Sequence, residues 1–204
     1  MAKKGLAKSL GSHLKNITKE CGLPIILYDE TKQSGSDFGS RFSNALQDVY
    51  NEGYDAVITI GNDSPHLETR HINQAQEQLL NGNTVIGPTF DGGFYLLGIA
   101  KEDFDRTAFL NFSWNTEAIY EEISQTFSNK EYSISVLQKL WDIDYFSDIK
   151  QLNVTTISNI SLRQVIQNIN SLSQDNYKNT TLYTFHPLFA IPFNKGSPSA
   201  IIFY

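Results

Sequence analysis

The chain has a single cysteine, few basic residues and no long apolar run, and each shortage excludes a class of protein. With Cys21 alone, neither an internal disulfide nor a cysteine-based zinc site can form. The 16 lysines and arginines against 22 aspartates and glutamates give a net charge of −6. This argues against nucleic acid as a partner, because proteins that bind it carry a basic face. No apolar run approaches the roughly 20 residues that a membrane-spanning helix needs. We therefore expect a cytoplasmic protein without a transmembrane segment.

Up to Leu152 the apolar residues follow helical and strand patterns in alternation. We expect helices from Leu6 to Cys21, from Phe38 to Gly53, from Glu68 to Leu80 and onward from Thr116. We expect strands from Leu23 to Tyr28, Tyr54 to Ile60, Thr84 to Gly87, Phe94 to Ile99 and Tyr132 to Leu137. Strands and helices in alternation predict an α/β sandwich with a mainly parallel sheet.

The composition changes after Leu152, which suggests two parts, residues 1–152 and a C-terminal extension of residues 153–204. Asn, Ser, Thr and Gln dominate the extension, apart from one weak helical pattern between Leu162 and Ile169. Its last segment, from Leu182 to Tyr204, is rich in aromatic and apolar side chains. We expect it to pack on the domain or on a second copy of the chain as a homodimer, because free exposure would leave a large apolar patch.

Two acidic motifs indicate a metal-dependent site for a phosphorylated ligand. Asp63 follows a buried strand and precedes Pro65, which places its carboxylate at the carboxyl edge of the sheet, where α/β proteins bind ligands. Asp142 and Asp144 flank Ile143, so in an extended segment both carboxylates face the same side. Carboxylate oxygens are the ligands that Mg²⁺ or Mn²⁺ prefers. The alternatives are a helix cap or an Asx turn at Asp63, and a helix cap at Asp144 or Ser147.

Three further positions could contact a ligand. The glycines of Asp91-Gly92-Gly93 allow a ligand to approach the backbone, and Asp91 could accept a hydroxyl proton as a general base. The alternative is the tight turn of a hairpin. Trp114 could stack on a sugar or a base, or seat a helix in the core. Arg41 could reach a phosphate, or be an ordinary surface arginine.

Five motifs in order give the chain a family resemblance: residues 60–67 (IGNDSPHL), Gly87-Pro88, residues 91–98 (DGGFYLLG), Trp114-Asn115-Thr116 and Asp142-Ile143-Asp144. Together they resemble a bacterial family described as glycosyltransferases of the radical-SAM/selenodomain-associated type. That family is similar to the nucleotide-diphospho-sugar transferase fold of GT-A type, a three-layer α/β sandwich. The resemblance covers roughly residues 23 to 150.

The resemblance implies a metal-dependent glycosyltransferase that uses a nucleoside-diphosphate sugar donor. It assigns the cation to Asp63, with Asp142 and Asp144 as later ligands, and it favours Asp91 as the catalytic residue. The partner is then a nucleotide sugar or a nucleotide. Candidate donor- or acceptor-binding residues are Gly61, Asn62, Gly92, Gly93, Trp114 and Arg41.

The chain departs from that family at its start. Members usually open with a strand and a loop of Gly and Lys that faces the nucleotide, whereas here the helix from Leu6 comes almost first. We therefore expect the usual first strand to be lacking, an open edge or slot in the sheet that another segment would need to cover, and weak donor binding. A nucleotidyltransferase of the same fold and a non-catalytic relative with a degraded donor site remain the alternatives.

Overall fold

The computed structural model describes residues 2–28, 32–128, 133–145, 147–178 and 200–203. Within these ranges the α-helices are α1 (Ala2–Glu20), α2 (Phe38–Asn51), α3 (Thr69–Leu80), α4 (Arg106–Asn111), α5 (Ile119–Ser128) and α6 (Ile160–Lys178). The strands are β1 (Ile25–Ile26), β2 (Ala56–Ile60), β3 (Thr84–Pro88), β4 (Phe94–Ala100), β5 (Ile134–Val136) and β6 (Ala200–Phe203), and short 3₁₀ helices cover Lys101–Asp103, Asp148–Gln151 and Val154–Thr156. No helix in these ranges is long and apolar enough to cross a membrane.

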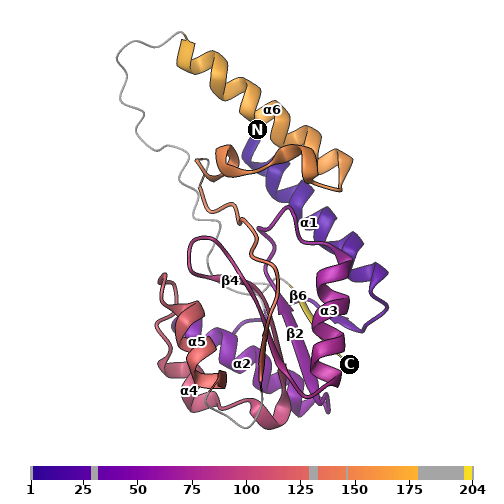
Figure 1. Ribbon diagram of the computed structural model, residues 1–204, viewed down its shortest axis with the longest axis vertical. Coiled ribbons are helices and arrows are strands. Elements are labelled where there is room, and N and C mark those ends of the chain that lie inside the picture. The colour runs from indigo at the N-terminus through magenta and orange to yellow at the C-terminus, as the bar shows by residue number, and fades with distance from the viewer. Residues whose placement is uncertain (1, 29–31, 129–132, 146, 179–199, 204) are drawn as a thin grey trace.

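The described strands form one mixed sheet in the order β1-β6-β2-β4-β3-β5 (Figure 1). The pairings set β1, β2, β3 and β5 in one direction, with β4 and β6 running between them in the other. An α/β fold with a mixed sheet is therefore confirmed. Among the described strands only β3 and β5 pair in parallel, because β4 returns from β3 through a turn at Thr89–Gly93. A parallel crossover needs a dozen or more residues, and this turn is far shorter.

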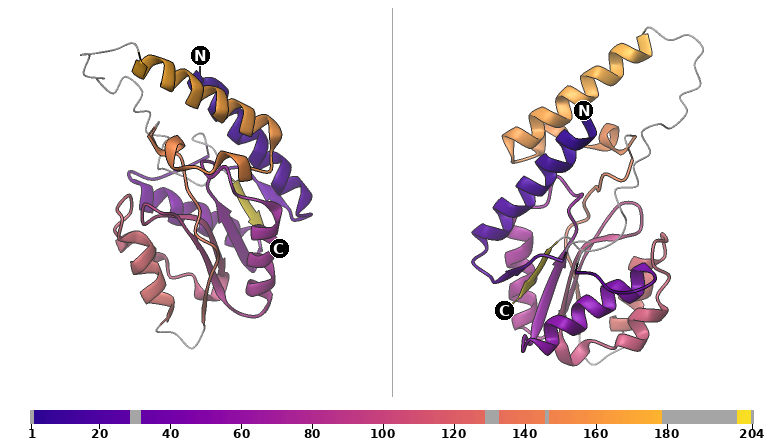
Figure 2. Two further views of the ribbon diagram at one scale, coloured as in Figure 1. Left: turned by 45° about the horizontal axis from the view of Figure 1, so that its top comes forward. Right: turned by 180° about the vertical axis from the view of Figure 1, so that it is seen from behind.

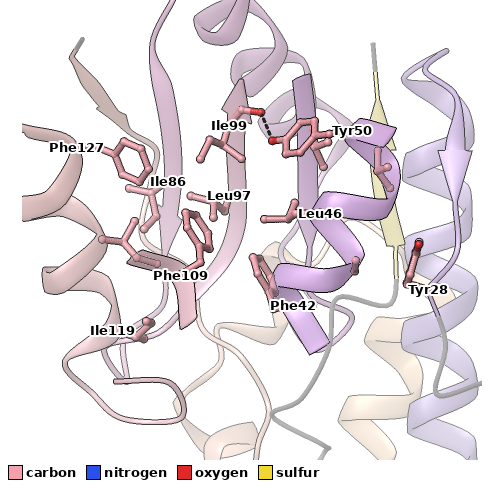
Figure 3. Close-up of a cluster of buried hydrophobic side chains, with 14 residues drawn as sticks. Tyr28, Phe42, Leu46, Tyr50, Ile86, Leu97, Ile99, Phe109, Ile119 and Phe127 are labelled. Atoms are coloured by element: carbon pink, nitrogen blue, oxygen red, sulfur yellow. Dashed lines mark hydrogen bonds between the residues drawn. The ribbon is translucent and has the colours of Figure 1, made fainter. Parts of the chain in front are cut away.

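One face of the sheet is covered by α2, α4 and α5, which enclose an aromatic core (Figure 3). Phe42, Leu46 and Phe109 are at most 2% exposed there. The hydroxyl of Tyr50 donates to the carbonyl oxygen of Ile99 over 3.0 Å, which satisfies the polar end of a buried side chain. Asp37 caps α2, because its carboxylate accepts from the Ser40 N–H over 2.8 Å.

The other face packs against α3 and the second half of α1. The helix α1 also packs against α6. The sheet-facing cluster includes Leu14 and Ile17 of α1 with Ile72 of α3. Both views in Figure 2 show α1 and α6 side by side. The core between them contains Leu6, Leu10, Ile143, Ile149, Leu152, Ile157, Leu162, Ile166 and Ile169. The first and last described helices thus share one hydrophobic core.

Several local expectations differ from the structure. The expected buried strand Leu23–Tyr28 is reduced to β1, with Ile25 44% and Leu27 52% exposed, because β1 lies at the edge of the sheet. The strand β6 lies between β1 and β2 and so covers the edge of β2 that faces away from β4. The remainder of the apolar tail, residues 182–199 and Tyr204, lies outside the described residues.

Candidate active site

A pocket opens at the carboxyl end of β2, where four loops meet. It is lined by Phe38, Phe42, Thr59, Ile60, Gly61, Asn62, Asp63, Asp91, Gly93, Phe94, Tyr95, Trp114, Asn115, Thr116, Ile119, Asp142 and Asp144. Four aspartates form one side of this set, and we call them the acidic wall. Phe38, Phe42, Phe94 and Trp114 form the aromatic wall.

The loop after β2 is bent so that Asp63 enters the pocket. The N–H of Gly61 donates to the carbonyl oxygen of Tyr95 over 2.8 Å. A Cβ on Gly61 would lie 2.9 Å from Oδ1 of Asp63, so a side chain at this position would displace that carboxylate. The carbonyl oxygen of Asp63 accepts from the N–H of Ile143 over 3.0 Å, which joins the two acidic segments. The cap of α3 is Glu68, so Asp63 is not a helix cap.

Asp91 lies in the turn between β3 and β4. Its Oδ1 accepts from the Thr89 hydroxyl over 2.5 Å and from the Gly93 N–H over 3.0 Å. Gly92 has a φ of +92°, which favours glycine, and a Cβ there would collide with the backbone of Glu117. The hairpin turn and the ligand site are therefore compatible, since the turn holds the Asp91 carboxylate at the pocket.

The side chains of the segment from Asp142 to Asp144 point in turn into the pocket, the core and the pocket again. Ile143 is fully buried in the core between α1 and α6, while both aspartates line the pocket. The N-cap position of the 3₁₀ helix Asp148–Gln151 is held by Ser147 and not by Asp144. The carboxylate of Asp148 accepts from the backbone N–H of Asp144 over 3.0 Å. Carboxylate oxygens of Asp91, Asp142 and Asp144 lie within 4.8 Å of one another.

The acidic wall concentrates negative charge. Burial raises the pKa of Asp142 to about 8, with the neighbouring charges of Asp63, Asp91 and Asp144 adding to the rise. Among the described residues that line the pocket, none is Lys, Arg or His. A divalent cation would offset this repulsion, and three carboxylates at this separation suit the oxygen preference of Mg²⁺ or Mn²⁺.

Trp114 belongs to both the core and the pocket. Its Nε1 donates to the carbonyl oxygen of Phe109 over 2.6 Å, and its ring centroid lies 4.9 Å from those of Phe38 and Phe42. A Cβ on Gly39 would lie 2.5 Å from the indole, so α2 and the ring pack in direct contact. The indole is thus fixed in position, as a stacking surface requires.

Histidines brace the loop that carries Asp63. Nε2 of His13, on α1, donates to the carbonyl oxygen of Leu67 over 2.8 Å. Nε2 of His66 lies 3.0 Å from the carbonyl oxygen of Asn153. Both histidines therefore tie this loop to other layers and neither lines the pocket.

The structure brings most of the sequence-predicted residues together, with two exceptions. Arg41 and Gly92 are not among the residues that line the pocket. Sequence reasoning missed Phe38 and Phe94, since their spacing marks them as core positions, and it named Asn115 only as part of the Trp114-Asn115-Thr116 motif. Asn115 has a φ of +61°, unusual for a residue other than glycine, and lines the pocket.

Comparisons with known proteins agree with this fold. Residues 28–116 match the family described as "Uncharacterized protein conserved in bacteria (DUF2064)". The crystal structure of a putative nucleotide-diphospho-sugar transferase from Desulfovibrio desulfuricans G20 is similar to this chain, with a TM-score of 0.62 and 26% sequence identity. The match covers 70% of this chain and 64% of that one, so the chain spans less than two thirds of the length of that neighbour. No curated protein matches the chain. The expected GT-A-like fold is confirmed, whereas the radical-SAM/selenodomain link stays a prediction.

Proposed function

We propose that this chain is a metal-dependent glycosyltransferase that uses a nucleoside-diphosphate sugar as donor. The observation that carries the proposal is the convergence of Asp91, Asp142 and Asp144, beside Asp63, at the carboxyl end of β2. In α/β sheets this edge is where ligands bind. The similarity to a nucleotide-diphospho-sugar transferase supports a transferase, and the aromatic wall supports a ring-containing ligand.

Mg²⁺ or Mn²⁺ would be held by Asp142 and Asp144 together with Asp91, whose oxygens approach one another most closely. Asp63 completes the acidic wall, because its charge also acts on Asp142. When bound, such a cation neutralises the charge that develops on a leaving diphosphate.

The other residues position the reactants and exclude water. The rings of Phe38 and Trp114 offer a rigid apolar surface to a sugar or a base. Oδ1 of Asp91 is held by two hydrogen bonds, so its carboxylate has a fixed direction from which to accept the proton of an acceptor hydroxyl. Asp91 therefore has two candidate roles, metal ligand and general base.

The test is release of nucleoside diphosphate from a panel of nucleotide sugars with Mn²⁺, with and without EDTA. We expect release that requires the metal and is lost in Asp142→Asn. Asp91→Asn separates the two roles. If Asp91 is the general base, the variant keeps Mn²⁺ affinity and loses turnover. If Asp91 is a metal ligand, the variant loses both. Asp55→Asn, an exposed aspartate outside the pocket, is the matched control.

Two results would overturn the proposal. Pyrophosphate release from a nucleoside triphosphate and a sugar phosphate would identify a nucleotidyltransferase, which attacks a different phosphorus atom. The absence of both Mn²⁺ binding and nucleotide binding would identify a non-catalytic relative.

A further inference from the structure

The strand β6 occupies a central place in the sheet although it comes from the last described residues. It pairs antiparallel with β2 on one side, from Val57↔Phe203 to Ile60↔Ala200. On the other side it pairs with Ile25 and Ile26 of β1. In Figure 1 it is the yellow strand beside β2. The backbone edge of β2 that faces away from β4 is therefore covered by β6.

The strand that β6 joins also belongs to a sheet on its other side. The strands β2, β4, β3 and β5 are neighbours in an unbroken order. By contrast, β1 has two residues and, among the described strands, pairs with β6 alone. The strand β6 thus lies along the edge of a four-stranded unit.

The chain that leads to β6 is long. Residues 179–199 separate the end of α6 at Lys178 from Ala200. Twenty-one residues can span up to about 70 Å when extended. A connection of this length does not by itself force β6 into place, so the backbone pairing must hold it there.

We propose that the edge of β2 is a strand-docking site whose ligand is the β6 segment of this chain, residues 200–203 (AIIF), and that the site accepts the same segment when a separate peptide of sequence SAIIFY carries it. Recognition is by β-augmentation, in which backbone hydrogen bonds supply affinity. Because Ala200 pairs with Ile60, directly before Gly61, docking also fixes the strand end that presents Asp63. This last coupling rests on the proposed function, whereas the docking does not.

The first test uses the full chain with Ile202→Pro, because proline lacks the N–H donor and disrupts a central strand. We expect the amides of β2 to exchange hydrogen at least tenfold faster than in the wild type. Addition of the peptide SAIIFY should restore their protection. The same peptide with N-methyl groups at the two isoleucines is the matched control and should have no effect. Unchanged exchange in the variant, or equal rescue by the methylated peptide, would overturn the proposal.

A second test covers the case in which this variant does not fold. A protease site is placed within residues 179–199 of the otherwise wild-type chain, and the folded protein is cut there. A fluorescent SAIIFY peptide should then bind, and unlabelled peptide should displace it while the methylated peptide does not. Failure of the fluorescent peptide to bind the cut protein would contradict strand docking.

The effect of β6 docking on the pocket is measured separately, as a change in Mn²⁺ affinity. The two tryptophans of the chain are Trp114, in the pocket, and Trp141, next to Asp142, so paramagnetic Mn²⁺ should quench their fluorescence. We expect Ile202→Pro to weaken Mn²⁺ binding about tenfold and the peptide to restore it. Faster exchange with unchanged Mn²⁺ affinity would refute the coupling and leave docking intact. A wild-type chain that does not bind Mn²⁺ would refute the proposed function, and hydrogen exchange would still decide the docking.

Discussion

The two walls of the pocket are built on opposite principles. The aromatic wall consists of rings in mutual contact, such as Phe42 against Phe94 and Trp114, and these contacts stabilise the fold without a ligand. The acidic wall brings carboxylates together, and hydrogen bonds such as those from the Thr89 hydroxyl and the Gly93 N–H to Asp91 hold it against their repulsion. The comparison indicates that stability resides in one wall, while the other is kept at a cost that a bound cation would offset.

The largest effect should come from breaking the aromatic wall. Phe42 is 2% exposed and contacts four other aromatic rings. Phe42→Ala should lower the free energy of unfolding by about 3–5 kcal/mol, because truncation leaves a cavity. Urea unfolding followed by tryptophan fluorescence measures it. Phe90→Ala, at a ring 47% exposed, is the control and should cost far less. Similar losses for both variants would contradict the comparison.

On the acidic wall, Asp142→Asn should change the response to metal. At a Mn²⁺ concentration about 100 times its dissociation constant, the wild type should gain about 2.7 kcal/mol of stability. The variant should gain almost none. Without metal and above about pH 8, where Asp142 is ionised in the folded wild type, it should melt higher than the wild type because one repelling charge is gone. Thermal melts with and without Mn²⁺ measure both effects. An equal Mn²⁺ shift in wild type and variant would remove Asp142 from the site.

The same residue predicts a pH dependence of stability. The pKa of Asp142 in the folded chain, about 8, lies above its ordinary value of 3.8. Between these values the folded state binds more protons than the unfolded state, so the free energy of unfolding should fall as the pH rises. Burial lowers the pKa of His13 and His71, which acts in the opposite direction mainly below neutral pH. Metal-free unfolding from about pH 7 to 8 should thus show the fall in wild type and a weaker one in Asp142→Asn. Parallel curves for the two proteins would contradict it.

The smallest effect concerns Gly61. In Gly61→Ala the new methyl group would lie 2.9 Å from Oδ1 of Asp63, so the carboxylate must move. We expect Mn²⁺ affinity to fall about threefold to tenfold, with less than about 1 kcal/mol change in stability. Quenching of tryptophan fluorescence by Mn²⁺ measures the affinity. Gly11→Ala, where a Cβ meets nothing within 4 Å, is the control. Unchanged affinity in Gly61→Ala would show that Asp63 does not contribute to binding.

The sequence predicted best what depends on local pattern. The strand that leads to Asp63, the helix after Asp37 and the shared side of Asp142 and Asp144 follow from apolar spacing and capping chemistry. The approach of Asp91 to that pair was not predicted, because it depends on how two distant loops meet. The parallel pairing expected around β4 is wrong, because β4 is antiparallel to both of its neighbours. The sequence contains the signal for this, since the turn before β4 is too short for a crossover connection.

What could not be predicted depends on contacts between remote parts of the chain. The strand β6 pairs with β2 residues that are at least 140 positions away, and nothing in its sequence selects β2 as its neighbour. The short helix α4 has six residues and carries only a weak apolar pattern. Arg41 was predicted to reach a phosphate because of its charge. The sequence does not state whether the side of α2 that carries Arg41 faces the pocket.

The burial of Ile143 makes the helical layer and the acidic wall linked equilibria. Its side chain lies in the core between α1 and α6, while its covalent neighbours on both sides are pocket aspartates. Any change that loosens that core alters the position at which the carboxylates of Asp142 and Asp144 enter the pocket. Linkage is reciprocal, so a cation that favours one arrangement of the two carboxylates must stabilise the packing of α6 on α1 by the same free energy. Residues such as Ile166, which do not line the pocket, would then modulate the affinity of the site from a distance.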